Sequence, residues 1–177
     1  GRKWRRFAHR EMIREMRKQV NPDGSDFEAS TCYHRLVLEM FFFPTFLRVV
    51  RDARFDGTNH REICRLLFGA SYTERLHRMF CVVRDVCTPD GYLPRVGDND
   101  SGRFHRISVD PASRDTSILP LGAVFFRDPY LKMMDAPCET LAWTMGSAGI
   151  DIWNQLPAGP PPGTAGYPDA GWFVMRH

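Results

Sequence analysis

Residues 22–34 read Pro-Asp-Gly-Ser-Asp-Phe-Glu-Ala-Ser-Thr-Cys-Tyr-His, and this stretch decides the fold. Its first three residues are typical of a turn, so they end whatever element precedes them. Ser25 and Glu28 have the spacing of a capping box, in which the two side chains satisfy free backbone N–H groups at the start of a helix. The spacing therefore predicts a helix that opens near Asp26 and continues through Tyr33.

Both flanks of this stretch have helical patterns. Upstream, apolar residues recur at steps of four in residues 4–20, with charges between them, which predicts an amphipathic helix. Downstream, the predicted helix runs through Leu36 into residues 41–47, which are so apolar on most sides that the helix must be buried. Pro44 predicts a kink in that helix.

The remainder of the chain predicts more helices and one terminal strand. Helices are expected near residues 62–67, 72–86, 115–126 and 138–145, a linker over 157–166, and a strand near 172–175. Residues 92–114 are expected to form a long loop, and loops of this length are usually functional or disordered. Pro-Asp-Gly recurs at residues 89–91, again after a helix, which indicates helical hairpins stacked in an array. We expect the two Pro-Asp-Gly turns to lie at the same end of that array.

Charge is unevenly distributed. The chain has a formal net charge of +3, and residues 1–20 hold eight Lys or Arg against Glu11 and Glu15. This basic stripe is either a solvated helix face or a surface for nucleic acid, anionic lipid or an acidic polysaccharide. The longest apolar run, residues 36–50, is interrupted by polar residues and proline, so no membrane span is expected.

Metal and disulfide chemistry are not favoured by the sequence. Five cysteines with no close Cys-x-x-Cys pair argue against a disulfide framework and a structural zinc site. Asp98, Asp100 and Gly102 have part of a calcium-loop pattern, but the third acidic ligand and the distal Glu are absent. No cofactor and no metal are therefore expected.

Residues 22–34 resemble the motif of the heparinase II/III-like polysaccharide lyases, in which a Pro-Asp-Gly turn leads to Phe-Glu-x-Ser-Thr-x-Tyr-His at the head of a buried helix. Residues 90–103, 121–125 and 169–176 are similar to later parts of the same family, in the same order. The resemblance implies an all-α fold, part of an (α/α) toroid of stacked helical hairpins. A short C-terminal β segment would begin a truncated β-sandwich domain.

The resemblance also implies a domain division and a chemistry. Residues 1–156 would form the C-terminal part of the toroid, 157–166 a Pro/Gly linker, and 167–177 the first strand of the β domain. The implied reaction is β-elimination on a uronic-acid-containing polysaccharide, with Tyr33 as the catalytic tyrosine by motif position. The alternative is that Tyr33 is a core residue at the start of a buried helix.

Three further residues are candidates for contacting substrate or supporting the site. His34 follows Tyr33 but points roughly 100° away from it on a helix, so at most it supports the site. Arg95 and Arg103 flank the glycine-rich part of the loop, where planar guanidinium groups could bind carboxylate or sulfate. Solvated loop arginines are the alternative reading.

The family pattern also contains an Asn or His that neutralises the substrate carboxylate and a β-domain His, and neither is matched here. We therefore expect an acidic polysaccharide as substrate, a chain that is inactive as an isolated fragment, and a periplasmic or secreted parent. The expected partners are the remaining toroid helices and the β domain of that parent, with no nucleic acid. The polymer, whether heparan sulfate, alginate or a bacterial exopolysaccharide, stays open. The alternative function is a non-catalytic helical module of exopolysaccharide assembly that binds carbohydrate or another anion.

Overall fold

The structure is a computed structural model of the 177-residue chain, and it describes residues 1–52, 59–99, 103–105, 115–133 and 136–176. The elements in chain order are α1 (Arg2–Gln19), α2 (Thr31–Val50), α3 (His60–Phe68), α4 (Ala70–Val86), η1 (Asp115–Ile118), α5 (Leu119–Phe126), η2 (Pro129–Leu131), α6 (Glu139–Gln155), β1 (Ala165–Tyr167) and β2 (Trp172–Val174). The prediction of a helical fold with a short C-terminal β segment is confirmed. None of the described helices is long and apolar enough to cross a membrane.

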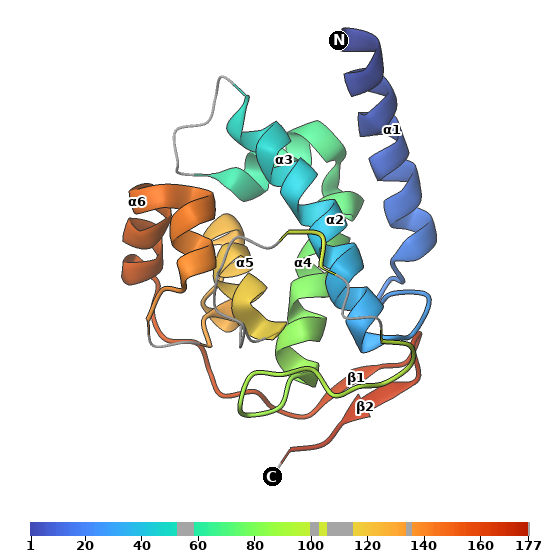
Figure 1. The fold of residues 1–177 in the computed structure, drawn as a ribbon, viewed down its shortest axis with the longest axis vertical. Coiled ribbons are helices and arrows are strands. Elements are labelled where there is room, and N and C mark those ends of the chain that lie inside the picture. The colour runs from blue at the N-terminus through green and yellow to red at the C-terminus, as the bar shows by residue number, and fades with distance from the viewer. Residues whose placement is uncertain (53–58, 100–102, 106–114, 134–135, 177) are drawn as a thin grey trace.

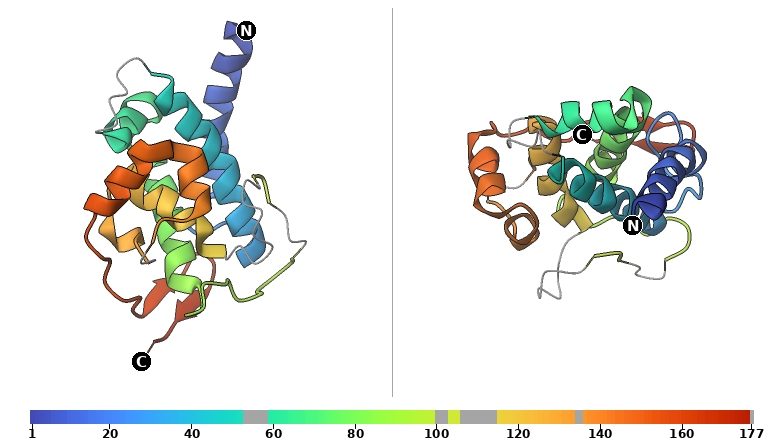
Figure 2. Two further views of the ribbon diagram at one scale, coloured as in Figure 1. Left: turned by 60° about the vertical axis from the view of Figure 1, so that its left-hand side comes forward. Right: turned by 90° about the horizontal axis from the view of Figure 1, so that it is seen from above.

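Helix α2 lies at the centre of the molecule, with α1 on one side and the α5–α6 pair on the other (Figures 1 and 2). Its predicted burial is confirmed, because Phe42 is fully buried and its ring lies 5.2 Å from that of Phe80 on α4 and 5.5 Å from that of Phe125 on α5. Burying each such ring contributes about 1.5–3 kcal/mol. The helix continues through Pro44 to Val50.

The predicted start of α2 is wrong. The helix begins at Thr31, with Ser30 as its N-cap. The Ser25 hydroxyl donates to Asp23 Oδ1 at 2.6 Å, so it does not cap a helix. Ala29 then has a φ of 51°, in the left-handed region, and a helix cannot run through it. The N-cap is therefore Ser30, five residues after the predicted cap Ser25.

The two Pro-Asp-Gly turns lie at the same end of the helical array, as expected. Figure 1 shows α1 and α4 running in the same direction and α2 running against both. Gly24 and Gly91 have φ values of 93° and 86°, which favour glycine. A Cβ added to Gly24 would lie 2.4 Å from the Arg78 Cβ, so this turn also requires the close approach that only glycine allows.

Strands β1 and β2 form an antiparallel hairpin in which Tyr167 faces Trp172 across the ladder. β1 begins at Ala165, inside the predicted linker, so the linker is shorter than the sequence indicated. Tyr167 of β1 packs against Val82 and Val86 of α4. The division into a helical and a β domain stays a prediction.

Candidate active site at the start of helix α2

Tyr33 lies in the first turn of α2, and the N-cap fixes its backbone. Ser30 Oγ accepts the Tyr33 N–H at 3.2 Å and donates its own proton to the Asp98 carbonyl at 2.7 Å. The Tyr33 side chain is half-buried. Its ring is therefore partly packed among neighbouring residues while solvent still reaches part of it.

The loop segment 94–98 lies directly on this helix start. Thr31 donates its hydroxyl to the Pro94 carbonyl at 2.5 Å and its N–H to the Val96 carbonyl at 3.1 Å. Gly97, with a φ of 73°, passes so close that an added Cβ would lie 3.0 Å from the Ser30 Cα. Arg95 lies between these two anchored carbonyls, and its side chain is exposed. The fold thus brings Arg95 and Tyr33 to the same end of α2.

A buried ion pair holds a later part of the loop on the same helix. Arg35 pairs with Glu39 one turn further along, and its Nε donates to the Asp115 carbonyl at 2.8 Å. Glu39 Oε2 accepts the N–H groups of Phe104 at 2.7 Å and His105 at 3.1 Å. Burial lowers the pKa of Arg35 to about 10, which the negative charge of Glu39 partly offsets, so Arg35 stays cationic at neutral pH.

Arg103 belongs to this network and differs from Arg95. Its Nη2 pairs with Asp115 Oδ1, and Asp115 Oδ2 accepts the Leu93 N–H at 2.9 Å. Arg95 has no ion-pair partner among the described residues. Within the described residues, the two loop arginines predicted to bind substrate therefore differ, since Arg103 is paired with Asp115 and Arg95 is exposed.

His34 is almost fully buried, with 1% of its surface exposed. Its Nε2 donates to the Met79 carbonyl of α4 at 3.0 Å, and Nδ1 has no hydrogen-bond partner in the described part of the chain. Burial lowers the pKa of this imidazole to about 4, so it is neutral at pH 7. The buried His34 side chain therefore joins α2 to α4.

Sequence reasoning missed the Arg35–Glu39 pair and His105. The available signal was an opposite-charge pair at i and i+4 inside an otherwise apolar helix. His105 is exposed, and its ring lies 4.4 Å from that of Phe43. Its anchor, Glu39, follows Tyr33 by six residues, or about 9 Å along the helix axis. His105 is therefore held beside α2, further along the helix than Tyr33.

The described residues contain no group of three His, Cys, Asp or Glu placed to hold a metal ion. Two residues of the rejected calcium pattern, Asp100 and Gly102, lie outside the described residues.

A helical hairpin array with a tyrosine at the head of its buried central helix is the arrangement that a polysaccharide lyase fold implied. A family model described as the heparinase II/III N-terminus matches residues 1–110, which is more than half of the chain. The chain therefore belongs to the heparinase II/III family. The match includes Tyr33, Arg95 and Arg103. No curated protein and no solved structure matches the chain.

Proposed function

We propose that this protein acts in the β-elimination of a uronic-acid-containing polysaccharide, with Tyr33 as the group that transfers a proton. The observation that carries the proposal is the position of Tyr33. It occupies the tyrosine of the family motif, its backbone is fixed by Ser30 and by the loop 94–98, and its side chain is half-buried.

The reaction removes the proton at C5, next to the carboxylate of the uronate. The electron pair of that bond forms a C4–C5 double bond, and the glycosidic oxygen leaves C4 and takes up a proton. A tyrosine phenol has a pKa of about 10, so its use as a base at pH 7 is penalised by roughly 4 kcal/mol. A cation close to the phenolate reduces this penalty, and a cation on the carboxylate makes C5 more acidic.

Arg95 is the cation best placed for the carboxylate. It is exposed, its neighbours Pro94 and Val96 are hydrogen-bonded to Thr31, and it has no ion-pair partner among the described residues. Arg103 is the matched comparison because it is paired with Asp115. The proposal therefore gives substrate binding to Arg95 and loop support to Arg103.

The test uses the natural gene product and the ultraviolet absorbance of unsaturated uronate, with heparan sulfate, alginate and a bacterial exopolysaccharide as substrates. Arg95→Ala should lower kcat/KM about tenfold to a hundredfold while leaving the thermal midpoint unchanged, since it removes a charge-assisted contact with substrate. Arg103→Ala should lower the thermal midpoint. Absence of unsaturated product on every polymer, or normal turnover by Arg95→Ala, would contradict the proposal.

We also propose an outcome for the activity of the 177 residues alone and a location for the parent protein. The Asn or His and the β-domain His of the family pattern have no match in this sequence, and catalytic groups that act as a unit fail together. The purified chain alone should yield no unsaturated uronate. Because its substrate is an extracellular polymer, we place the parent in the periplasm or outside the cell, which cell fractionation tests.

A further inference from the structure

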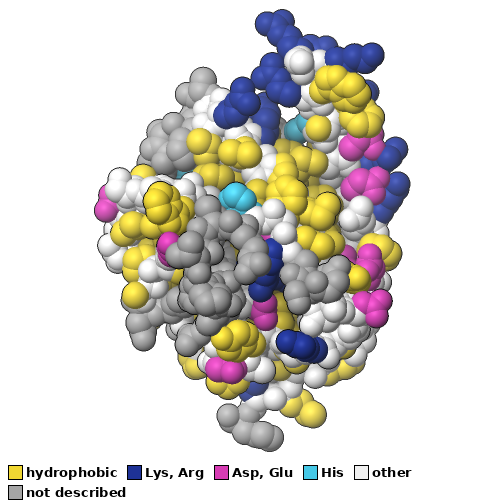
Figure 3. Space-filling model, viewed as in Figure 1, with side chains coloured by type: hydrophobic (Ala, Val, Ile, Leu, Met, Phe, Trp, Pro, Cys, Tyr) yellow, Lys and Arg dark blue, Asp and Glu magenta, His cyan; other side chains and the backbone are white. Residues whose placement is uncertain are grey.

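A groove of about 610 Å³ lies between the first half of α1 and the end of α2. We call it the basic groove because five arginines line it, namely Arg2, Arg5, Arg6, Arg48 and Arg51. Figure 3 shows dark blue side chains gathered at the end of the molecule where these arginines lie. This groove is distinct from the site at Tyr33, since Arg48 follows Tyr33 by fifteen residues, or about 22 Å along α2.

The positive charge of the basic groove is largely uncompensated. The first turn of α1 contains no acidic residue. In the part of the chain that the structure describes, the only ion pair of these five arginines joins Arg48 to Asp52 at 3.7 Å. Cations at the N-terminus of a helix also oppose its dipole, which is positive at that end. An anion bound in the groove would relieve both kinds of repulsion.

The floor of the groove is apolar. Met12, Leu47 and Phe68 line it, and Leu47 is 60% exposed. An apolar floor with arginines at its rim suits a narrow chain that has carbon–hydrogen faces and regularly spaced anionic groups. A sugar chain with carboxylates or sulfates has this chemistry, and the planar fork of arginine binds both groups in a bidentate manner.

Two other anionic partners fit the groove less well. Single-stranded nucleic acid is bound by stacking its bases on exposed aromatic rings. The exposed aromatics of α1, Trp4 and Phe7, do not line the groove, and Phe68 within it is only 4% exposed. A flat lipid surface would not follow a recess between two helices.

We propose that the basic groove binds a second stretch of the acidic polysaccharide, apart from the stretch at Tyr33. The identity of the ligand rests on the proposed function. Binding at both ends of α2 would retain a long polymer after each elimination, because the second contact becomes intramolecular. Short substrates that reach only the Tyr33 end would gain nothing from the groove.

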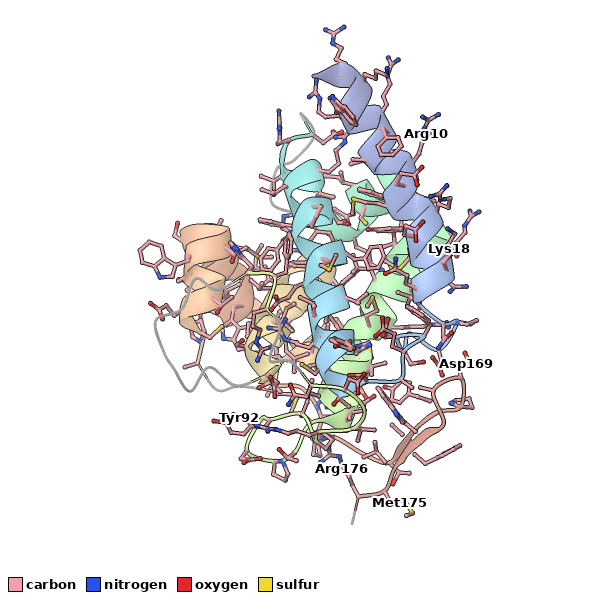
Figure 4. The ribbon with its side chains drawn as sticks, turned by 45° about the vertical axis from the view of Figure 1, so that its right-hand side comes forward. Arg10, Lys18, Tyr92, Asp169, Met175 and Arg176 are labelled. Atoms are coloured by element: carbon pink, nitrogen blue, oxygen red, sulfur yellow. The ribbon has the colours of Figure 1, made fainter. Side chains whose placement is uncertain are left out.

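The test is a calorimetric titration of the natural gene product with a hexameric alginate oligomer and a heparan sulfate hexasaccharide, with cellohexaose as the neutral control. The groove variant combines Arg5→Gln, Arg6→Gln and Arg48→Gln. The matched control combines Arg10→Gln, Arg17→Gln and Lys18→Gln, which removes the same charge. Figure 4 shows Arg10 and Lys18 on the outer side of α1, pointing away from the rest of the molecule.

The groove variant should bind the acidic hexamers about tenfold more weakly or worse, and the control variant within about twofold of the original protein. Equal losses in both variants would overturn the proposal. So would a failure of both acidic hexamers to bind, or groove-dependent binding of only a single-stranded oligonucleotide or of vesicles containing phosphatidylserine.

Folding and the proposed function are controlled separately. The substituted side chains of both variants are exposed, so both variants should keep the original thermal midpoint. In the original protein the hexamer should slow amide exchange in residues 2–12 and 44–51, and unchanged exchange there would overturn the proposal. Tyr33→Phe should leave this protection intact. Protection without elimination would contradict the proposed function alone, whereas elimination without protection would contradict only the groove.

Discussion

The imidazole of His34 is held as a neutral hydrogen-bond donor, and this has a consequence for stability. Burial lowers its pKa from 6.5 to about 4. The unfolded chain therefore takes up a proton between these two pH values while the folded chain does not. Stability supplied by the neutral ring is present above about pH 6.5 and is lost as the pH falls towards 4, by about 3 kcal/mol in all.

We predict that His34→Gln removes this pH dependence, because glutamine keeps a donor for the Met79 carbonyl but does not titrate. The measurement is urea unfolding at pH 7 and pH 4.5 for both proteins. Burial raises the pKa of the Asp26 carboxyl to about 6, so the contribution of Asp26 to stability changes with pH in the opposite direction. The test therefore compares the pH dependence of the His34→Gln protein with that of the original protein. An equal pH dependence in both would show that His34 is not buried in its neutral form.

The direction of His34 was predictable from sequence, because adjacent helical residues point about 100° apart. Its partner was not, because the Met79 carbonyl belongs to a helix 45 residues away. Arg95 and Arg103 were equivalent in the sequence. The contact between Arg103 and Asp115 distinguishes them in the structure.

At the scale of elements, α2 illustrates what local patterns determine. Its apolar run predicted burial correctly, since few other environments accept that many phenylalanines. Its first residue was predicted wrongly because Ser25 and Ser30 both have the chemistry of a cap. The choice depends on one local and one tertiary contact. The Ser25 hydroxyl donates to Asp23, two residues away, whereas the Ser30 hydroxyl donates to the Asp98 carbonyl, which comes from the loop after α4.

Residues 104 and 105 of the loop after α4 are attached to α2 through Glu39. We predict that Glu39→Ala lowers the free energy of unfolding by about 3–5 kcal/mol, because it leaves Arg35 buried without its counter-ion and frees two backbone N–H groups. Amide exchange at Phe104 and His105 should increase in the same variant. The measurements are urea unfolding and hydrogen exchange.

The control for this prediction is Glu74→Ala. Glu74 makes exposed ion pairs with Arg61 at 3.3 Å and Arg78 at 3.4 Å, so its loss should cost less than about 1 kcal/mol. Similar losses for the two variants would show that the Arg35–Glu39 pair does not hold the loop.

At the scale of the whole molecule, the C-terminal hairpin is attached to the helical body at two places. Asp85 Oδ2 accepts the hydroxyl of Tyr167 at 2.7 Å, and Arg176 donates to the Asp85 carbonyl at 2.9 Å. At the other end, Asp169 and Asp23 exchange backbone-to-carboxylate hydrogen bonds of 3.0 and 3.3 Å, and Figure 4 shows Asp169 beside the turn that follows α1. The hairpin thus contacts the end of α4 and the turn that follows α1.

The sequence predicted a strand here but not its docking. The docking depends on Asp85, whose charge and proximity help burial to raise the pKa of Tyr167 well above its usual range. We predict that Tyr167→Phe lowers the free energy of unfolding by about 2 kcal/mol, since a buried carboxylate oxygen loses its donor. Tyr92→Phe, at an exposed tyrosine, is the control for thermal unfolding. A Tyr167→Phe protein as stable as the original would mean that the hairpin is not held by this bond.

The central claim is that Tyr33 transfers a proton during elimination, and the most direct measurement is eliminative turnover by Tyr33→Phe in the natural gene product. Phenylalanine keeps the ring that packs at the start of α2 and removes only the hydroxyl, so the thermal midpoint should change little. Turnover should fall by roughly 10²–10⁴-fold, as expected for loss of a general acid or base. Near-normal turnover by a correctly folded Tyr33→Phe protein would contradict the account and make Tyr33 a packing residue.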